Sequence, residues 1–301
     1  MKSPRQSAAH HRPRILLALS VAALLILMLL GGSILYVTVA RPDVGYGLQD
    51  LLRKRTALEL NETEAGGTEA VLLADIRAGT REEITWQNSL WLVNAAHPLS
   101  EDAELMLTEY KDTELLVDRS GVSALQELLQ TAEEETGDRI YLMSSYRTRE
   151  EQEAEYLADP QLAVPAGTSE HETGLALDLY VYQKAQREFI TAKGGVWIQE
   201  HAHEYGWIIR YPFGKKSVTG VSFEPWHIRY VGKPHAALMY ANRWTLEEYL
   251  EQLEIGRFYT AAGYAFSRQE PRDGALLIPS DWKNVTVSAD NTGAYILTGQ
   301  L

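Results

Sequence analysis

Four side chains in two short segments have the types and spacing of a hydrolytic metal site. His171 and Asp178 lie seven residues apart in SEHETGLALD, and Glu224 and His227 lie three apart in FEPWHIRY. A hydrolytic zinc ion needs three protein ligands, an open position for water and a base beside it. Two imidazoles and two carboxylates meet that requirement, with one carboxylate left to accept a proton.

Other metal chemistries are less well supported. The chain has no cysteine, so a metal must be held by His, Asp or Glu, and no disulfide framework is available. No H-E-x-x-H motif occurs. His201 and His203 are two apart in a predicted helix and face different directions, so we expect them, like His97 and His235, to be structural.

Three separated motifs, SSYRT, SEHETGLALD and EPWHIRYVG, occur in an order and spacing that resemble the VanY-type D-alanyl-D-alanine carboxypeptidases. These are zinc peptidases that trim peptidoglycan stem peptides. The resemblance runs from about residue 92 to about residue 250. It implies an α+β fold: a compact zinc-peptidase domain with a central antiparallel sheet flanked by helices.

The resemblance also implies roles for individual residues. One Zn²⁺ ion is expected on His171, Asp178 and His227, with Glu224 as catalytic base. The arginine of the SYR motif falls on Arg147, whose planar guanidinium can pair with the terminal carboxylate of a substrate through two hydrogen bonds.

Further substrate contacts are expected around this site. Polar side chains at Gln152 and Ser169 and the aromatic ring of Trp226 are the candidates. Tyr146, Trp207 and Tyr211 could wall the substrate peptide or simply belong to the core. Arg229 is expected to pair with an internal carboxylate. The segment between the first two motifs, from Arg149 to Thr168, is shorter than in many relatives, which leaves the length of the preferred peptide open.

The elements that must position these residues follow from hydrophobic spacing and end signals. Predicted helices cover 123–137 with Gly137 as the stop, 149–159 ended by Pro160, and 194–207 with Val196, Trp197 and His201 toward the core. A capping box at Thr245 and Glu248 opens another helix. Strands are expected at 139–146, around Asp178, at 207–212 and at 221–232, and DNTG near residue 290 is a hairpin turn.

The remainder of the chain suggests a division into five parts. Residues 15–40 carry no charge and exceed the thickness of a bilayer as a helix, so they are expected to be a transmembrane anchor. A cleaved signal peptide is the alternative. Basic residues before this segment place the N-terminus in the cytoplasm and the rest of the chain outside. The expected parts are a cytoplasmic tail (1–14), the anchor (15–40), an extracellular stalk (41–85), the zinc carboxypeptidase domain (86–255) and a β-rich extension (256–301).

The net charge of the part expected to lie outside the cell limits the classes of partner it can bind. Residues 41–301 hold 24 Lys and Arg against 41 Asp and Glu, a net charge of −17, which disfavours nucleic acid. Together with the resemblance, the sequence predicts a monomeric enzyme that is anchored in the membrane and acts on peptidoglycan stem peptides. Two alternatives stay open: an L,D-carboxypeptidase acting on tetrapeptide stems, and a zinc-containing cell-wall-binding protein without turnover.

Overall fold

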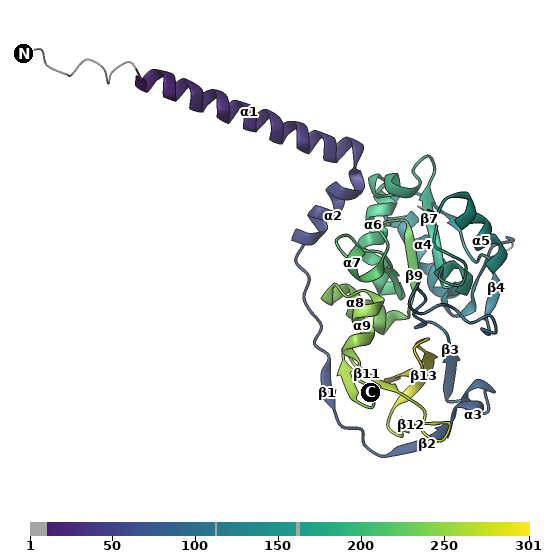
Figure 1. Ribbon diagram of the computed structural model, residues 1–301. Coiled ribbons are helices and arrows are strands. Elements are labelled where there is room, and N and C mark those ends of the chain that lie inside the picture. The colour runs from purple at the N-terminus through teal and green to yellow at the C-terminus, as the bar shows by residue number, and fades with distance from the viewer. Residues whose placement is uncertain (1–10, 112, 161–162) are drawn as a thin grey trace, which may run out of the picture.

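The part of the chain that carries the predicted site residues is built on a four-stranded antiparallel sheet with the order β6-β7-β9-β8 (Figure 1). The computed structural model describes residues 11–111, 113–160 and 163–301. The strands of this sheet are β6 (Ile140–Ser144), β7 (Ala176–Val181), β8 (Trp207–Ile209) and β9 (His227–Tyr230). The predicted mixed α+β architecture with an antiparallel sheet is confirmed.

One face of this sheet is the core and the other carries polar side chains. In β7, Leu177, Leu179 and Val181 point into an apolar cluster, while Asp178 and Tyr180 alternate with them and face the other way. Helix α4 supplies the apolar stripe that covers the core face, and it ends at Gly137 in the left-handed conformation, as predicted. The helices of this half are α4 (Val122–Thr136), α5 (Arg149–Ala158), α6 (Lys193–His201), α7 (Lys216–Thr219), α8 (Lys233–Asn242) and α9 (Leu246–Gln252).

Short elements connect these strands and helices. Both α5 and α9 open with capping boxes, Thr148 with Glu151 and Thr245 with Glu248. The 3₁₀ turns are η1 (Arg119–Gly121), η2 (Glu170–Thr173), η3 (Gln186–Thr191) and η4 (Ala202–Tyr205), and a hairpin pairs β4 (Leu107–Glu109) with β5 (Leu116–Asp118).

The buried face of α6 differs from the predicted one. Ile198 and Gln199 are buried, whereas Val196 and His201 are only partly covered. The cause lies at the start of the helix, where a Cβ on Gly195 would stand 1.9 Å from the carbonyl oxygen of Phe189. The helix therefore packs with its Gly195 side against the core, and Ile198 and Gln199, one turn further along that side, are buried with it. The predicted single helix also changes to η4 before Gly206.

A second β structure joins the C-terminal strands to the segment that precedes the four-stranded sheet. A six-stranded sheet has the order β1-β10-β11-β14-β13-β3, and β12 pairs with β2 (Figure 1). Residues 61–87, within and beside the segment expected to be a stalk, thus supply three of these strands. The bounds are β1 (Asn61–Thr63), β2 (Thr68–Leu72), α3 (Leu73–Arg77), β3 (Ile84–Gln87), β10 (Phe258–Ala261), β11 (Tyr264–Gln269), β12 (Ala275–Pro279), β13 (Lys283–Ala289) and β14 (Tyr295–Gln300).

This β structure packs on the part of the chain that carries the four-stranded sheet. Tyr249 and Leu250 of α9 share one apolar cluster with Phe266 and Ile296. The predicted turn before β14 is present, with Asp290 Oδ1 accepting hydrogen bonds from the backbone of Thr292 and Ala294.

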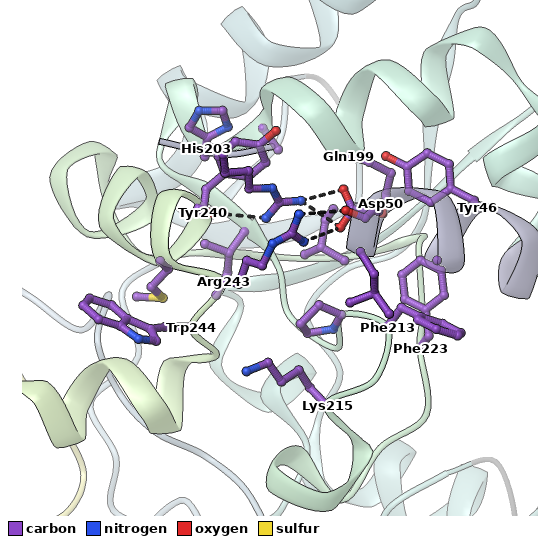
Figure 2. Close-up of a pocket in the computed structure, with 18 of the residues that line it drawn as sticks. Tyr46, Asp50, Gln199, His203, Phe213, Lys215, Phe223, Tyr240, Arg243 and Trp244 are labelled. Atoms are coloured by element: carbon purple, nitrogen blue, oxygen red, sulfur yellow. Dashed lines mark hydrogen bonds and ion pairs between the residues drawn. The ribbon is translucent and has the colours of Figure 1, made fainter. Parts of the chain in front are cut away.

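The segment before β1 also packs against the part of the chain that carries the four-stranded sheet. Helix α2 (Pro42–Leu52) packs closely against Phe213 at Gly47. A Cβ at this position would lie 2.2 Å from the phenyl ring, so the contact requires glycine. Asp50 then accepts hydrogen bonds from Arg55 (2.7 and 2.9 Å) and Arg243 (3.1 Å) at the wall of a cavity of about 100 Å³ (Figure 2). The chain is therefore fixed to the domain soon after α2 ends.

The helix that precedes α2 covers the segment that was expected from the sequence to be a membrane anchor. Helix α1 (His11–Ala40) exposes several large apolar side chains, among them Leu29 and Val39. Among the described residues, no helix is both long enough and apolar enough to cross a membrane. Residues 1–10 of the expected cytoplasmic tail, with Lys2 and Arg5, lie outside the described residues.

Candidate metal centre and active site

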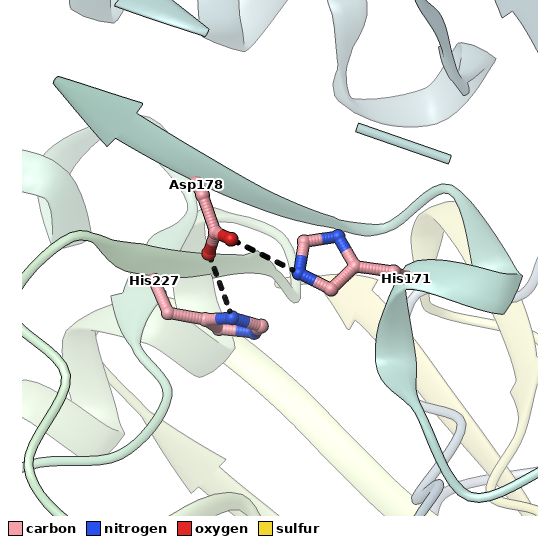
Figure 3. A group of neighbouring side chains, drawn as sticks. All are labelled: His171, Asp178 and His227. Carbon is pink, nitrogen blue, oxygen red and sulfur yellow. Dashed lines mark ion pairs between the residues drawn. The ribbon is translucent and has the colours of Figure 1, made fainter. Parts of the chain in front are cut away.

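His171, Asp178 and His227 converge on one point on the outward face of the sheet (Figure 3). Each offers one ligand atom, and these atoms all lie within 4.8 Å of one another. His171 Nε2 is 3.5 Å from Asp178 Oδ2, and His227 Nδ1 is 3.1 Å from Asp178 Oδ1. Two nitrogens and a carboxylate fit the donor set of a catalytic zinc site, which leaves a further position for water.

Strand register brings two of these residues together. Asp178 of β7 is paired directly with His227 of β9, so their side chains stand side by side on the same face. His171 comes from η2, the turn before β7. That turn ends at Gly174 with φ +73°, where a Cβ would lie 2.4 Å from a methyl carbon of Leu107. Only glycine fits this approach without displacement, which explains the glycine between the first two ligands.

The ring of His171 is oriented by the backbone. Its Nδ1 lies 2.9 Å from the carbonyl oxygen of Ser145. A carbonyl can only accept, so Nδ1 carries the hydrogen and Nε2 presents its lone pair toward Asp178. This is the arrangement that metal-binding histidines need.

Glu224 stands beside the three ligands without belonging to the set. Its Oε2 is 3.8 Å from His227 Nδ1, and its side chain is 22% exposed. Burial raises the pKa of the Glu224 carboxyl to about 7, with a further contribution from Asp178 against an opposing one from His227. A carboxylate with a raised pKa at the mouth of the site has the chemistry of a general base.

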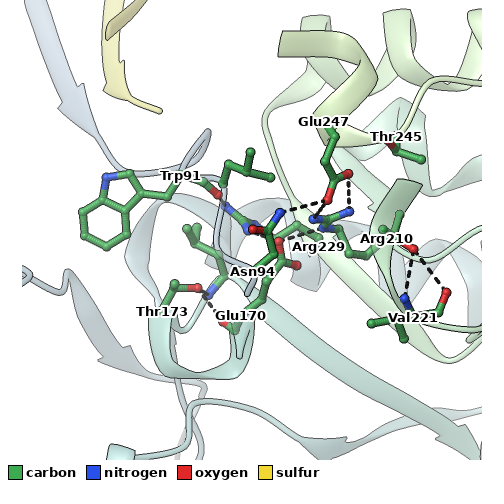
Figure 4. A network of polar contacts seen from close by, with 12 residues as sticks. Trp91, Asn94, Glu170, Thr173, Arg210, Val221, Arg229, Thr245 and Glu247 are labelled. Atoms are coloured by element: carbon green, nitrogen blue, oxygen red, sulfur yellow. Dashed lines mark hydrogen bonds and ion pairs between the residues drawn. The ribbon is translucent and has the colours of Figure 1, made fainter. Parts of the chain in front are cut away.

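A buried ionic network surrounds Glu170 (Figure 4). Glu170 Oε1 accepts hydrogen bonds from Arg210 Nε and Arg229 Nη1, both at 2.7 Å. Arg210 also forms a bidentate pair with Glu247 at 2.9 and 2.7 Å. The expected pairing of Arg229 with an internal carboxylate is thus confirmed.

This network faces the second nitrogen of His227. Glu170 Oε2 is 3.9 Å from His227 Nε2, and neither atom has a hydrogen-bond partner among the described residues. Although burial opposes ionisation, the guanidiniums of Arg210 and Arg229 hold the pKa of Glu170 well below its usual range. A negative charge therefore stands where an Nε2–H of His227 would be directed.

The charges around His227 also act on the imidazole. Burial alone would lower the pKa of His227, but the carboxylates of Asp178 and Glu170 raise it to about 9. Burial likewise opposes ionisation of Asp178, whose pKa is held well below its usual range by His171 and His227. The protonation of the two imidazoles and the charge of Asp178 therefore depend on one another, and the Asp178 carboxylate favours a cation at this position.

Arg147 and Gln152 form one unit near the ligands. Arg147 Nη1 donates to Gln152 Oε1 (2.8 Å) and Nη2 to Ser144 Oγ (3.2 Å), while the backbone N–H of Arg147 donates to the carbonyl of His171 (3.2 Å). Gln152 is 1% exposed, and its amide nitrogen donates to the carbonyl of Val164. Gln152 therefore holds Arg147 in place, and its contact with substrate stays a prediction.

The other predicted pocket residues have different positions. Ser169 is buried at the start of η2, and Trp226 is partly buried against the main apolar cluster. Trp207 is 1% exposed and belongs to the core. Tyr211 packs beside a predicted metal ligand, with its ring centroid 4.8 Å from that of His227. Two of the histidines expected to be structural occupy such positions: His203 stacks on Tyr240, and His235 is buried.

Comparisons with known proteins place this geometry in a family. The VanY family model, described as D-alanyl-D-alanine carboxypeptidase, matches residues 114–233. The bifunctional D-Ala-D-Ala dipeptidase and D-Ala-D-Ala carboxypeptidase VanXYC of Enterococcus gallinarum is 34% identical over 184 residues, which cover 55% of this chain and 95% of that protein. The chain belongs to the VanY family.

Another VanY-type relative is longer than the shared region. A D-alanyl-D-alanine carboxypeptidase of Enterococcus faecium is 33% identical over 187 residues, 58% of this chain. The chain spans 61% of the length of that relative.

Two solved structures share the fold with this VanY-family chain. The D,D-dipeptidase VanXYg, solved with a D-Ala-D-Ala phosphinate analogue, superposes with a TM-score of 0.63 at 26% identity, covering 78% of this chain and all of that one. The second is the LD-carboxypeptidase LdcB, whose structure reveals the molecular basis of peptidoglycan recognition. It superposes with a TM-score of 0.50 at 31% identity, covering 54% of this chain and 86% of that one.

Proposed function

We propose that this protein is a zinc-dependent carboxypeptidase that removes the terminal D-alanine from peptidoglycan stem peptides. The convergence of His171, Asp178 and His227 beside Glu224 is the observation that carries the proposal. Membership of the VanY family supports the reaction, since the matched relatives are named for hydrolysis of D-Ala-D-Ala.

Each residue has a defined part in the proposed reaction. A zinc ion on the two histidines and Asp178 would supply an acidified water and polarise the scissile carbonyl. Glu224 would serve as the base that accepts a proton from the attacking water and as the acid that returns it to the leaving amine. Arg147, held by Gln152 and Ser144, pairs with the terminal carboxylate and so restricts cleavage to the last residue of the peptide.

We also propose that the enzyme is a monomer held at the outer face of the cell membrane. The support is the uncharged segment 15–40, followed by α2 docked on the catalytic half. Cell fractionation with and without residues 1–40, together with protease accessibility of intact cells, tests this location. Release of the full-length chain by salt alone would contradict it.

Product analysis of the Glu224→Gln variant tests the reaction. The full-length protein is incubated with pentapeptide stems ending in D-Ala-D-Ala, and products are weighed by mass spectrometry. We expect Glu224→Gln to reduce kcat by about 10²–10⁴-fold with bound zinc unchanged, because the base is lost and the ligands are not. Glu204→Gln, whose side chain pairs with His201, is the matched control. Undiminished turnover in Glu224→Gln would exclude the assigned role, and absence of turnover in the wild type would favour a wall-binding protein.

The similarity to LdcB supports one rival, cleavage of tetrapeptide stems as an L,D-carboxypeptidase. Both reactions use the same ligands, base and carboxylate contact, and differ in the chirality of the residue before the scissile bond. Parallel incubation with pentapeptide and tetrapeptide stems separates them. Release of D-alanine from the tetrapeptide alone would establish the L,D activity instead.

A further inference from the structure

Glu224 and His227 stand at the two ends of one β-turn. The backbone N–H of His227 donates to the carbonyl of Glu224 (3.2 Å), and Pro225 occupies the second position, which its fixed φ suits. The candidate base is therefore the first residue of the turn, and the candidate metal ligand is the fourth. The position of the base relative to the metal centre depends on the conformation of the two residues between them.

Strand β9 fixes only the end of the turn that carries His227. His227 is paired with Asp178 of β7, and its carbonyl accepts a hydrogen bond from the backbone N–H of Arg210 (3.2 Å). Glu224 lies before the strand, and its backbone N–H donates to the carbonyl of Tyr211 (3.1 Å). A change in the turn would therefore displace Glu224 while His227 remains in the sheet.

The middle of the turn depends on a side chain from another element. A β-turn uses the carbonyl of its first residue for its own hydrogen bond, so the carbonyl of the second residue needs an outside partner. Pro225 is buried, and its oxygen accepts a hydrogen bond of 2.6 Å from Nε2 of Gln199 on α6. The next carbonyl, that of Trp226, accepts from the backbone N–H of Leu179 (3.0 Å). Among the hydrogen bonds that the described residues make to the backbone of this turn, that of Gln199 alone comes from a side chain.

The packing of α6 holds Gln199 where this contact requires it. Gln199 is 6% exposed and lies on the side of the helix that the close approach of Gly195 to Phe189 turns toward the core. A buried carbonyl without a partner is costly. Loss of the Nε2 donor therefore favours another conformation of the turn, in which the carbonyl of Pro225 finds a different partner.

We propose that Gln199 is a positioning residue for the reaction: through the carbonyl of Pro225 it holds the turn in the conformation that places Glu224 beside the metal centre. This inference rests on the proposed function, in which Glu224 is the base. The effect falls on the chemical step, because Arg147, the proposed contact for the substrate carboxylate, follows β6 and is not part of the turn.

Removal of the donor tests this role in the full-length protein. Gln199→Met keeps an unbranched side chain, and Gln199 lines the cavity of about 100 Å³ beside α2, which gives the substituted side chain room (Figure 2). With pentapeptide stems ending in D-Ala-D-Ala, we expect kcat to fall about 10–100-fold and KM to change less than about twofold, because the base is displaced and the carboxylate contact is not. Bound zinc should be unchanged.

A buried glutamine far from the site provides the matched control. Gln269 is also 6% exposed, and its Nε2 donates to the backbone carbonyl of Leu277. Gln269→Met should lower the melting temperature and leave kcat unchanged, because it removes the same kind of hydrogen bond elsewhere. If Gln199→Met does not fold, Gln199→Asn takes its place, since its amide is one methylene too short for the contact.

A double variant separates positioning from a general loss of structure. Because Gln199 acts through Glu224, Gln199→Met should change the residual kcat of Glu224→Gln less than about twofold. The same 10–100-fold loss in both backgrounds would mean that Gln199 only supports the fold. Full kcat in the folded single variant would equally overturn the inference.

Hydrogen exchange gives a readout that needs no turnover. The backbone N–H groups of Glu224 and His227 are both hydrogen-bonded, so a peptide covering residues 222–228 should exchange faster in Gln199→Met than in the wild type or Gln269→Met. Equal exchange in all three proteins would show that Gln199 does not hold the turn. If the wild type cleaves no stem peptide, the proposed function fails, and the exchange rates alone decide for or against the contact that holds the turn.

Discussion

The guanidinium of Arg147 is held in place before any substrate arrives. Gln152 and Ser144 accept two of its N–H groups, and Gln152 is itself fixed by the carbonyl of Val164. Preorganisation of this kind reduces the entropy lost when a carboxylate binds. A point charge in the same position would not replace it, because lysine lacks the planar pair of donors.

We therefore expect Arg147→Lys to raise KM for peptides with a free terminal carboxylate by about tenfold or more, since one charge-assisted hydrogen bond is lost. Steady-state kinetics with D-Ala-D-Ala peptides measures this change. Arg149→Lys is the matched control, because Arg149 lies two residues on and pairs with Glu172 and the carbonyl of Leu99. A peptide with an amidated C-terminus should be equally poor for wild type and Arg147→Lys. Loss of activity in Arg149→Lys as large as in Arg147→Lys would argue for a general structural effect.

Residue types and spacing were sufficient to find the groups that meet at the metal centre. His171, Asp178, Glu224 and His227 were recognisable because their chemistry is rare in combination. Glu170 was not, although it adjoins His171, because a glutamate before a histidine has no pattern of its own. Its position emerges only when η2 is folded against β8 and β9, which bring Arg210 and Arg229 to it from far along the chain.

At the scale of elements, Glu170 connects η2 with both of those strands and, through Arg210, with α9. All of these charges are buried, and removal of one partner leaves the others without compensation. The same carboxylate faces His227 Nε2. The same buried charges therefore stabilise the packing of four elements and help to orient the His227 ring.

We predict that Glu170→Gln lowers the free energy of unfolding by about 3–5 kcal/mol and weakens zinc binding by about 10–100-fold. Denaturant titration and competition with a chromogenic chelator measure the two effects. Glu172→Gln is the control, because Glu172 is also buried in η2 but bonds to the backbone of Gly167 and to Arg149. Zinc affinity that falls equally in both variants would argue against a particular role for Glu170.

The elements themselves were partly predictable, for reasons that differ from one to another. The ends of α4, α5 and α9 were marked by local signals, a left-handed glycine and two capping boxes, which act within a few residues. The buried face of α6 was not, because it depends on how closely Gly195 approaches Phe189. The pairing of β1 and β3 with C-terminal strands was equally hidden, since partners about 200 residues apart leave no local pattern.

At the scale of the whole molecule, the C-terminal strands complete a sheet that begins before the catalytic domain. Strand β13 lies between β3 and β14, and β10 pairs with β1, so both ends of the chain depend on this sheet. Phe266 and Ile296 also belong to the apolar cluster of α8 and α9. The C-terminal strands are therefore part of the folded unit.

Deletion of residues 256–301 is expected to expose this cluster and lower the melting temperature by well over 10 °C, because several fully buried apolar side chains lose their partners. Differential scanning calorimetry measures the change. Leu277→Ala, at a side chain 42% exposed on β12, serves as a control in the same region and should shift melting little. An unchanged melting temperature after the deletion would mean that the catalytic half folds without these strands.

His235 joins the catalytic half to the C-terminal sheet and makes their union sensitive to acid. Its Nδ1 lies 2.6 Å from the hydroxyl of Tyr249 and its Nε2 3.0 Å from that of Thr298, and burial lowers its pKa to about 3. Between this value and about 6.5 in the unfolded chain, the unfolded state binds more protons, so the free energy of unfolding decreases as pH falls. From pH 7.5 to 5.0 the wild type should lose about 2 kcal/mol more than His235→Gln in denaturant titrations. His97→Gln should keep the wild-type slope, and identical slopes for wild type and His235→Gln would refute the assignment.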